Sequence, residues 1–412
     1  MANAGEAVRR LFSEGFRIFF LFAGLFAIAA LAWWELYLGV HYTGGFVTAI
    51  PFAMPPHEWH AHELVFGYGS AALGGFLLTA VPSWTGGGAA RHWFIAVAAA
   101  AWFAGRLALW VSGALPWWGV ALADLAFLPI LWTKVALLLV KRPKPQNAVF
   151  LIFLSLFWLA NLATHLGWAG LWDAGEIDGP RAGLMALAGM VLVIGGRVTP
   201  AFTRNAMHRA GTPEAALPRD AAIFTPVMIA AAMLLPLSAL LLPGTALAAL
   251  VAIVTGAGQL LRQRRWGLRF AARQPILATL HLSAALVGLG LIAIGASRFT
   301  ALSEVGALHL LGIGGIGGMT LAMMSRATLG HTGRPLVAPG PVALAYALIP
   351  VAALLRMAAS ELSGAFYFPA TLTAGALWIF AFGLYVAGMV PAFLGPRADR
   401  APLTPPARTA AD

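Results

Sequence analysis

The chain consists of long apolar segments separated by short breaks that contain proline, glycine and charged residues. Each segment has about the 20 residues that an α-helix needs to cross the hydrocarbon core of a bilayer. The runs are too long and too continuous for the alternating strands of a membrane barrel. They predict an all-α, polytopic integral membrane bundle of about 12 transmembrane helices, at residues 17–39, 59–82, 93–112, 116–140, 147–169, 181–202, 221–241, 243–262, 275–297, 302–326, 340–357 and 365–394.

The basic residues orient this bundle. All but four of the 26 lysines and arginines lie in the N-terminal segment, in the alternate loops that follow it, or in the tail. Lysine and arginine in short loops mark the cytoplasmic face, so both termini are predicted to be cytoplasmic. A wrong number of helices would scramble this alternation, which supports keeping the break at Leu242-Pro243-Gly244 between the seventh and eighth segments. The four exceptions are Arg106, Arg181, Arg298 and Arg356.

Composition agrees with a membrane protein. Of the 412 residues, 60% are hydrophobic and 10% are charged, which is too few polar residues to cover a soluble globular enzyme. The net charge of +11 is explained by topology and requires no nucleic-acid partner. We expect a single transmembrane domain over residues 1–396, whose first apolar run is a retained helix, and a disordered cytoplasmic tail over 397–412.

Polar and ionisable groups inside the predicted helices are candidate functional residues, because burying them in a bilayer is costly. The predicted helix directions place most of them in the outer third of the bundle, although they come from distant segments. His281 is the exception, since it lies about two turns from the cytoplasmic end of the ninth segment. The outer group comprises His60, His62, Glu63, Arg106, Asp124, Asn161, His165 and His309.

Histidine is the leading candidate ligand for any metal. The chain has no cysteine, which excludes disulfides, thiolate sites and iron–sulfur clusters. Neutral imidazole suits haem iron and copper. In a regular helix His60 and His62 point about 200° apart and would serve different partners. The glycine run 312–318 has no preceding strand, so it indicates close helix packing and not a dinucleotide loop.

Two further features have alternative interpretations. Arg106 could neutralise Asp124 or Glu63, or it could contact a cofactor carboxylate. On the cytoplasmic side, a group of basic residues could serve only to set the topology. Alternatively, together with His281, which lies deeper in the membrane, it could form an inner site for a cofactor or a quinone head group. This inner group includes Arg197, Arg204, Arg326, His331 and Arg334.

The sequence resembles the NnrS family of bacterial membrane proteins. The resemblance is carried by FRIFFLFAGLFA (16–27), WHAHE (59–63), GRVTPAFTRNA (196–206) and GHTGRP (330–335), and it extends over most of the chain. It implies a multi-pass protein of the bacterial inner membrane that contains haem and copper and protects against nitric oxide. It does not imply which reaction the protein catalyses or which residues bind the haem and the copper. One departure is Ser283-Ala284-Ala285, where bulkier aromatic residues are expected beside His281.

The residues and the resemblance together give a metalloprotein hypothesis. His62 and His309 are candidate axial ligands of a haem, expected to be b-type, while His60 and His165 are candidate copper ligands. A haem held by His281 from the cytoplasmic side is the rival arrangement. Arg106 could pair with haem propionates, and Glu63 and Asp124 could relay protons.

Three other functions stay open at this stage. A haem facing copper could reduce nitric oxide with a quinol or another electron donor, which would make the protein an oxidoreductase. A secondary transporter without metal fits twelve helices equally well. A third alternative is a structural partner of enzymes that handle nitric oxide. The sequence does not predict the oligomeric state.

Overall fold

The computed structural model describes residues 4–141, 145–219, 223–362 and 364–398. Within these ranges the chain is helical and contains no strand. The described residues form twelve helices that are long and apolar enough to cross a membrane, which confirms the fold class predicted from the sequence.

The first six spans cover the N-terminal half of the chain. They are α2 (Gly15–Tyr42); the second span, made of α3 (Pro56–His62), a π-helical turn (Glu63–Tyr68) and α4 (Gly69–Thr85); α5 (Trp93–Trp110); the fourth span, made of α6 (Trp117–Leu125) and α7 (Phe127–Lys141); α8 (Pro145–Trp168); and α9 (Gly175–Arg209). The short α1 (Ala4–Leu11) precedes them.

The last six spans cover the C-terminal half of the chain. They are α10 (Phe224–Leu241); α11 (Ala246–Gln263); α13 (Pro275–Ser297); the tenth span, made of α14 (Glu304–His309), a π-helical turn (Leu310–Gly317) and α15 (Gly318–His331); α16 (Gly340–Glu361); and α17 (Tyr367–Leu394). The short α12 (Leu268–Ala271) lies between α11 and α13.

The predicted breaks match the structure closely. The seventh and eighth spans are separate, and the Thr245 hydroxyl caps α11 by accepting a hydrogen bond from the Ala248 amide at 3.3 Å. The sixth span is longer than predicted, because the helix begins at Gly175, before Pro180, and continues past residue 202 to Arg209. Of the predicted tail 397–412, residues 399–412 lie outside the described residues.

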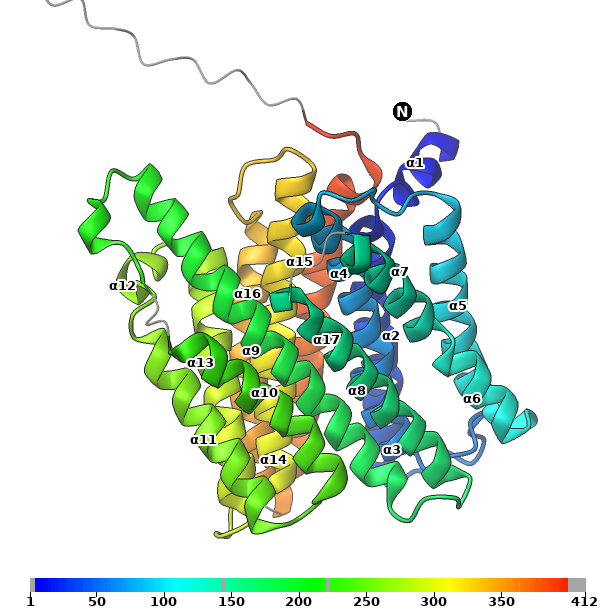
Figure 1. Ribbon diagram of the computed structural model, residues 1–412. Helices are drawn as coiled ribbons and strands as arrows, with labels where there is room; N and C mark the ends of the chain where they lie inside the picture. The colour runs from blue at the N-terminus through cyan, green and yellow to red at the C-terminus, as the bar shows by residue number, and fades with distance from the viewer. Residues whose placement is uncertain (1–3, 142–144, 220–222, 363, 399–412) are drawn as a thin grey trace, which may run out of the picture.

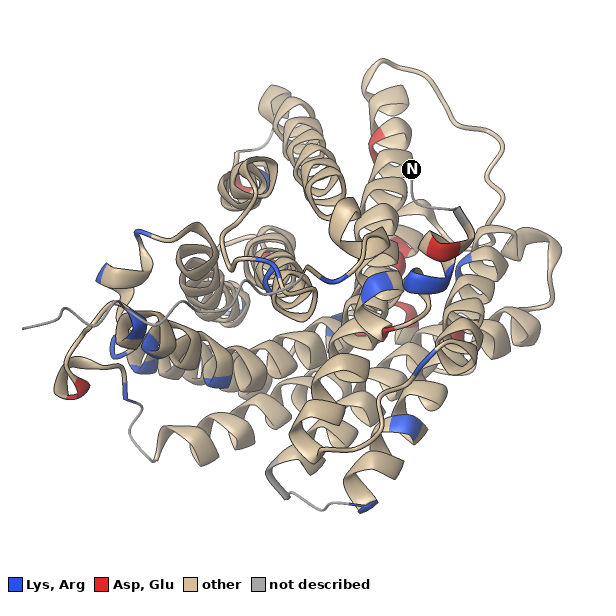
Figure 2. Ribbon diagram, turned by 90° about the horizontal axis from the view of Figure 1, so that it is seen from above, with Lys and Arg blue, Asp and Glu red and all other residues tan. Residues whose placement is uncertain are grey.

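Helix α1 and the C-terminal end of α17 lie at the same end of the bundle (Figure 1). Arg17, at the start of α2, joins them: its Nη1 donates to the carbonyl oxygens of Ala392, Phe393 and Gly395 at 2.9, 2.8 and 3.1 Å. These are carbonyls at the end of α17 that have no partner within the helix, so the arginine caps the last span. Figure 2 looks onto this end and shows lysines and arginines on several helix ends and loops.

The spans pack as a single bundle. Helix α17 packs along α2 and α16, α13 packs along α11, and α9 lies between α8 and α10. Close approach depends on glycine, as the sequence predicted for residues 312–318. A Cβ on Gly315 would lie 3.1 Å from the Val287 backbone, and one on Gly290 would lie 2.9 Å from the Leu311 backbone. The π-helical turn of the tenth span therefore contacts α13 almost backbone to backbone.

Two spans contain a π-helical turn near the same end of the bundle. The π-helical turns begin at Glu63, directly after His62, and at Leu310, directly after His309. Such turns widen the helix by one residue and re-aim the side chains beside them, and they are frequent at functional sites. The short helices that carry the histidines, α3 and α14, lie at the end opposite to α1 (Figure 1).

Candidate metal centres

A cavity lies between α2, α3, α9, the tenth span, α16 and α17. Its volume is about 300 Å³, in the size range of small-molecule and cofactor sites. We call it the histidine cavity, because His60 and His309 face it from the two spans that contain a π-helical turn. Trp34, Glu35, Tyr68, Arg181, Arg356 and Trp378 also line it.

The two imidazoles are oriented alike. Their ring centroids lie 6.4 Å apart and their planes differ by 13°. The His60 ring stacks on Trp34 at 4.6 Å, which fixes its plane. His309 donates from Nδ1 to the carbonyl oxygen of Val305 at 2.7 Å, so its Nε2 is left to face another partner. Orientation of a ring through its other nitrogen is typical of metal-ligating histidine.

The Nδ1 atom of the His60 ring is buried and has no hydrogen-bond partner within the described part of the chain. A buried polar atom without a partner costs about 1–3 kcal/mol. Two imidazoles that bind one ion from opposite sides have centroids roughly 6 Å apart, since each metal–nitrogen bond is about 2 Å and each centroid lies ~1 Å further back. The observed spacing therefore fits a shared metal ion.

The cavity also contains charged residues that were not assigned a role from the sequence. Arg356 is 8% exposed, donates to the Ser360 hydroxyl at 2.6 Å and lies 5.8 Å from the centroid of the Tyr367 ring. Glu35 of α2 lines the same cavity. Both fall inside predicted membrane spans, so the rule that singled out Arg106 could also have found them.

A second site lies on the other side of α3, and we call it the buried cluster. It consists of His62, Glu63, Arg106, Asp124, Asn161 and His165, which come from the second to the fifth spans and are all buried. His60 and His62 thus point to different sites, as the geometry of a regular helix predicts.

Hydrogen bonds connect the histidines of the cluster to Asp124. His62 Nε2 lies 2.8 Å from Asn161 Oδ1 and 3.2 Å from Asp124 Oδ2. The Asn161 amide and His165 Nε2 donate to the same carboxylate oxygen at 2.8 and 2.9 Å. One ligand atom each of His62, Asp124 and His165 lies within 4.8 Å of the other two. Among the described residues, this is the group of three whose spacing can hold a metal ion.

Arg106 joins the two carboxylates of the cluster. Its Nη1 donates to Glu63 Oε1 and Oε2 at 2.8 and 2.9 Å, and its Nη2 pairs with Asp124. The first of its two predicted roles, neutralising Asp124 or Glu63, is the one that these contacts support. Glu63, Asp124 and Arg106 together leave one negative charge, which a single proton or monovalent cation can balance.

The fourth span is interrupted where it supplies Asp124. Pro129 has no amide hydrogen, so it cannot bond the Leu125 carbonyl one turn earlier. The Trp158 indole of α8 donates to this carbonyl at 3.1 Å instead. The break between α6 and α7 therefore places Asp124 against α8 while the backbone stays satisfied.

Gly67 gives Arg106 room to reach Glu63. A Cβ at this position would lie 2.7 Å from both Arg106 Nη1 and Glu63 Oε2 and 2.5 Å from the Phe26 ring. We predict that Gly67→Ala lowers the unfolding free energy by about 1–3 kcal/mol through overpacking. Thermal unfolding in detergent measures this. Gly383→Ala is the matched control, since nothing lies within 4 Å of that position in α17. Equal stability of both variants would contradict the prediction.

Residues of the predicted inner group on the cytoplasmic side contact neighbouring side chains. His281 Nε2 lies 3.0 Å from the Thr203 hydroxyl, and Arg197 donates to Asn147 Oδ1 at 3.2 Å. The Arg326 guanidinium stacks on the Phe202 ring at 3.2 Å, and the His331 ring lies 5.6 Å from that of Phe16. The structure brings His309 against His60 and His62 against His165, and it groups neither pair with His281.

Comparison with known proteins identifies the family. The sequence model described as NnrS protein matches residues 10–397, which is nearly the whole chain and confirms the resemblance found in the motifs. None of the curated proteins matches the chain.

Proposed function

Because the chain belongs to the NnrS family, we propose that it is a haem- and copper-containing protein of the bacterial inner membrane that acts in the response to nitric oxide. It binds nitric oxide, or carries out redox chemistry on it, at two histidine sites in the outer half of the bundle. The end that carries α1 and the C-terminal end of α17 faces the cytoplasm, since it has the basic loops.

The observation that carries this proposal is the pair His60 and His309 in the histidine cavity. Their parallel rings, their spacing and the unpartnered His60 nitrogen would allow these two histidines to hold a haem iron. Bound haem would supply the iron for binding nitric oxide and for one-electron chemistry. Arg356 and Arg181 line the same cavity and can pair with the haem carboxylates.

The buried cluster is the proposed copper site, with His62, His165 and Asp124 as ligands. Imidazole nitrogen is a good copper ligand, and the single negative charge of the cluster matches monovalent copper. His62 has acceptors near both ring nitrogens, because Glu63 Oε1 lies 3.3 Å from Nδ1. A proton and a metal ion therefore compete for this imidazole, and metal binding should release a proton. Glu63 is positioned to hold it.

An optical spectrum with metal analysis tests the proposal. Purified protein should show a Soret band that changes when nitric oxide is added, and it should contain iron and copper. A colourless preparation without either metal, from cells supplied with both, would contradict the proposal and favour transport.

The copper assignment predicts a selective loss. His165→Ala and Asp124→Asn should lower copper affinity by at least about 10–100-fold, the cost of losing even an outer-shell partner. The Soret band should remain, because neither residue lines the histidine cavity. Copper is measured after dialysis against a chelator, and His309→Ala, which should keep its copper, is the control. Loss of haem with retention of copper would reverse the two assignments.

A further inference from the structure

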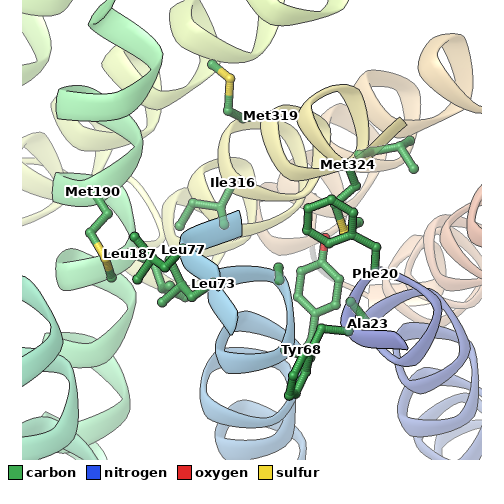
Figure 3. Close-up of a cluster of buried hydrophobic side chains, with 14 of the residues drawn as sticks. Phe20, Ala23, Tyr68, Leu73, Leu77, Leu187, Met190, Ile316, Met319 and Met324 are labelled. Carbon is green, nitrogen blue, oxygen red and sulfur yellow. The ribbon is translucent and has the colours of Figure 1, made fainter. Parts of the chain in front are cut away.

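A second, smaller pocket lies deeper in the bundle, and we call it the methionine pocket. Its volume is about 60 Å³, and four methionines from α9 and α15 line it. Figure 3 shows part of this region, with Leu187 and Met190 of α9, Leu73 of α4, and Ile316 and Met319 of the tenth span.

The methionine pocket adjoins the histidine cavity. Leu187 and Ile316 line both spaces, so two aliphatic side chains separate them. On α4, Ala72 lines the pocket ten residues beyond His62, a rise of about 15 Å. This is half of the roughly 30 Å hydrocarbon thickness, so the pocket lies near the middle of the membrane. Phe76 and Val191 in its wall are half-buried.

The chemistry of the wall excludes water as the natural occupant. Thr320 supplies the one polar side chain of the wall, and its hydroxyl is occupied by Tyr68 at 2.5 Å and the Ile316 carbonyl at 2.8 Å. A buried water needs 2–4 polar partners, whereas an apolar cavity stays dry and takes apolar guests such as xenon. The volume suits one small apolar molecule.

We infer that the methionine pocket is a holding site for a small apolar gas, which enters from the bilayer and passes Leu187 and Ile316 to the histidine cavity. Flexible methionine side chains can yield to such a guest. The identity of the gas as nitric oxide rests on the proposed function, whereas the gas site itself does not.

Xenon binding tests the site independently of any metal. The full-length protein in lipid nanodiscs is examined under xenon pressure by xenon NMR or by density in a structure. Ala72→Leu adds three carbon atoms to the pocket and should abolish xenon binding. Ala80→Leu makes the same change at a half-buried position further along α4 that does not line the pocket, and it should bind xenon like the wild type. Absence of xenon from the wild-type pocket, or equal binding by both variants, would overturn the inference.

The rate of nitric-oxide binding after flash photolysis tests the route. Ala72→Leu should slow the bimolecular binding of nitric oxide several-fold. Leu187→Ala removes part of one of the two side chains that separate the pocket from the histidine cavity, and it should speed this binding. Equal rates in wild type and Ala72→Leu would overturn the route. A preparation that binds xenon in this pocket but contains no haem would defeat the proposed function and leave the gas site standing.

Discussion

Replacement of His60 or His309 by alanine is expected to remove the haem. Each variant loses one of the two imidazoles that face each other at 6.4 Å across the histidine cavity. Loss of an outer-shell partner already lowers metal affinity about 10–100-fold, and loss of a ligand should cost more. The measurement is the Soret absorbance per protein, with iron analysis, after purification from cells supplied with haem.

Two controls make this result specific. His41→Ala removes a histidine whose Nδ1 bonds the Tyr37 carbonyl and which does not line the cavity, so it should keep its haem. His281→Ala tests the rival inner site and should also keep it. Retained copper shows that the His60 and His309 variants are folded. A normal Soret band in the double variant would refute the assignment, and haem loss in His281→Ala alone would favour the inner site.

Replacement of Arg106 by methionine should give the largest loss of stability. Arg106 is 8% exposed and balances two buried carboxylates, Glu63 and Asp124. Removal of one partner from a buried ion pair costs about 3–5 kcal/mol, because the remaining charge stays buried. We therefore expect Arg106→Met to unfold at a clearly lower temperature or to fail to accumulate in the membrane.

A double-variant cycle separates charge from packing. Arg106→Met combined with Asp124→Asn removes one buried negative charge and should recover part of the lost stability. Arg204→Met is the matched control, since Arg204 and Glu214 form a half-exposed pair that is worth about 0–1 kcal/mol. Equal effects of Arg106→Met and Arg204→Met would show that the buried charges are balanced in another way.

The sequence identifies residues of both the histidine cavity and the buried cluster, but not their partners. His60, His62 and His309 were recognisable because ionisable groups are rare in membrane spans. The sequence did not show which of these histidines lie together. Successive residues of a helix point about 100° apart, so a small rotation of a helix changes which neighbour a side chain contacts. The π-helical turns after His62 and His309 rotate the helix in this way, and no pattern of residues predicted these turns. Arg356 and Glu35 were not assigned a role from the sequence, although both lie inside predicted spans.

By itself, the sequence determined the number of spans, their approximate limits, the family and the end of the bundle where the polar groups gather. These features follow from hydrophobic length and from the distribution of charge, which act along the chain. Only the tertiary structure decided that His60 faces His309, that His62 joins His165 and Asp124, and that Arg106 is held by two carboxylates. Those contacts depend on the rotation and packing of helices distant in sequence, which depth along a span does not fix.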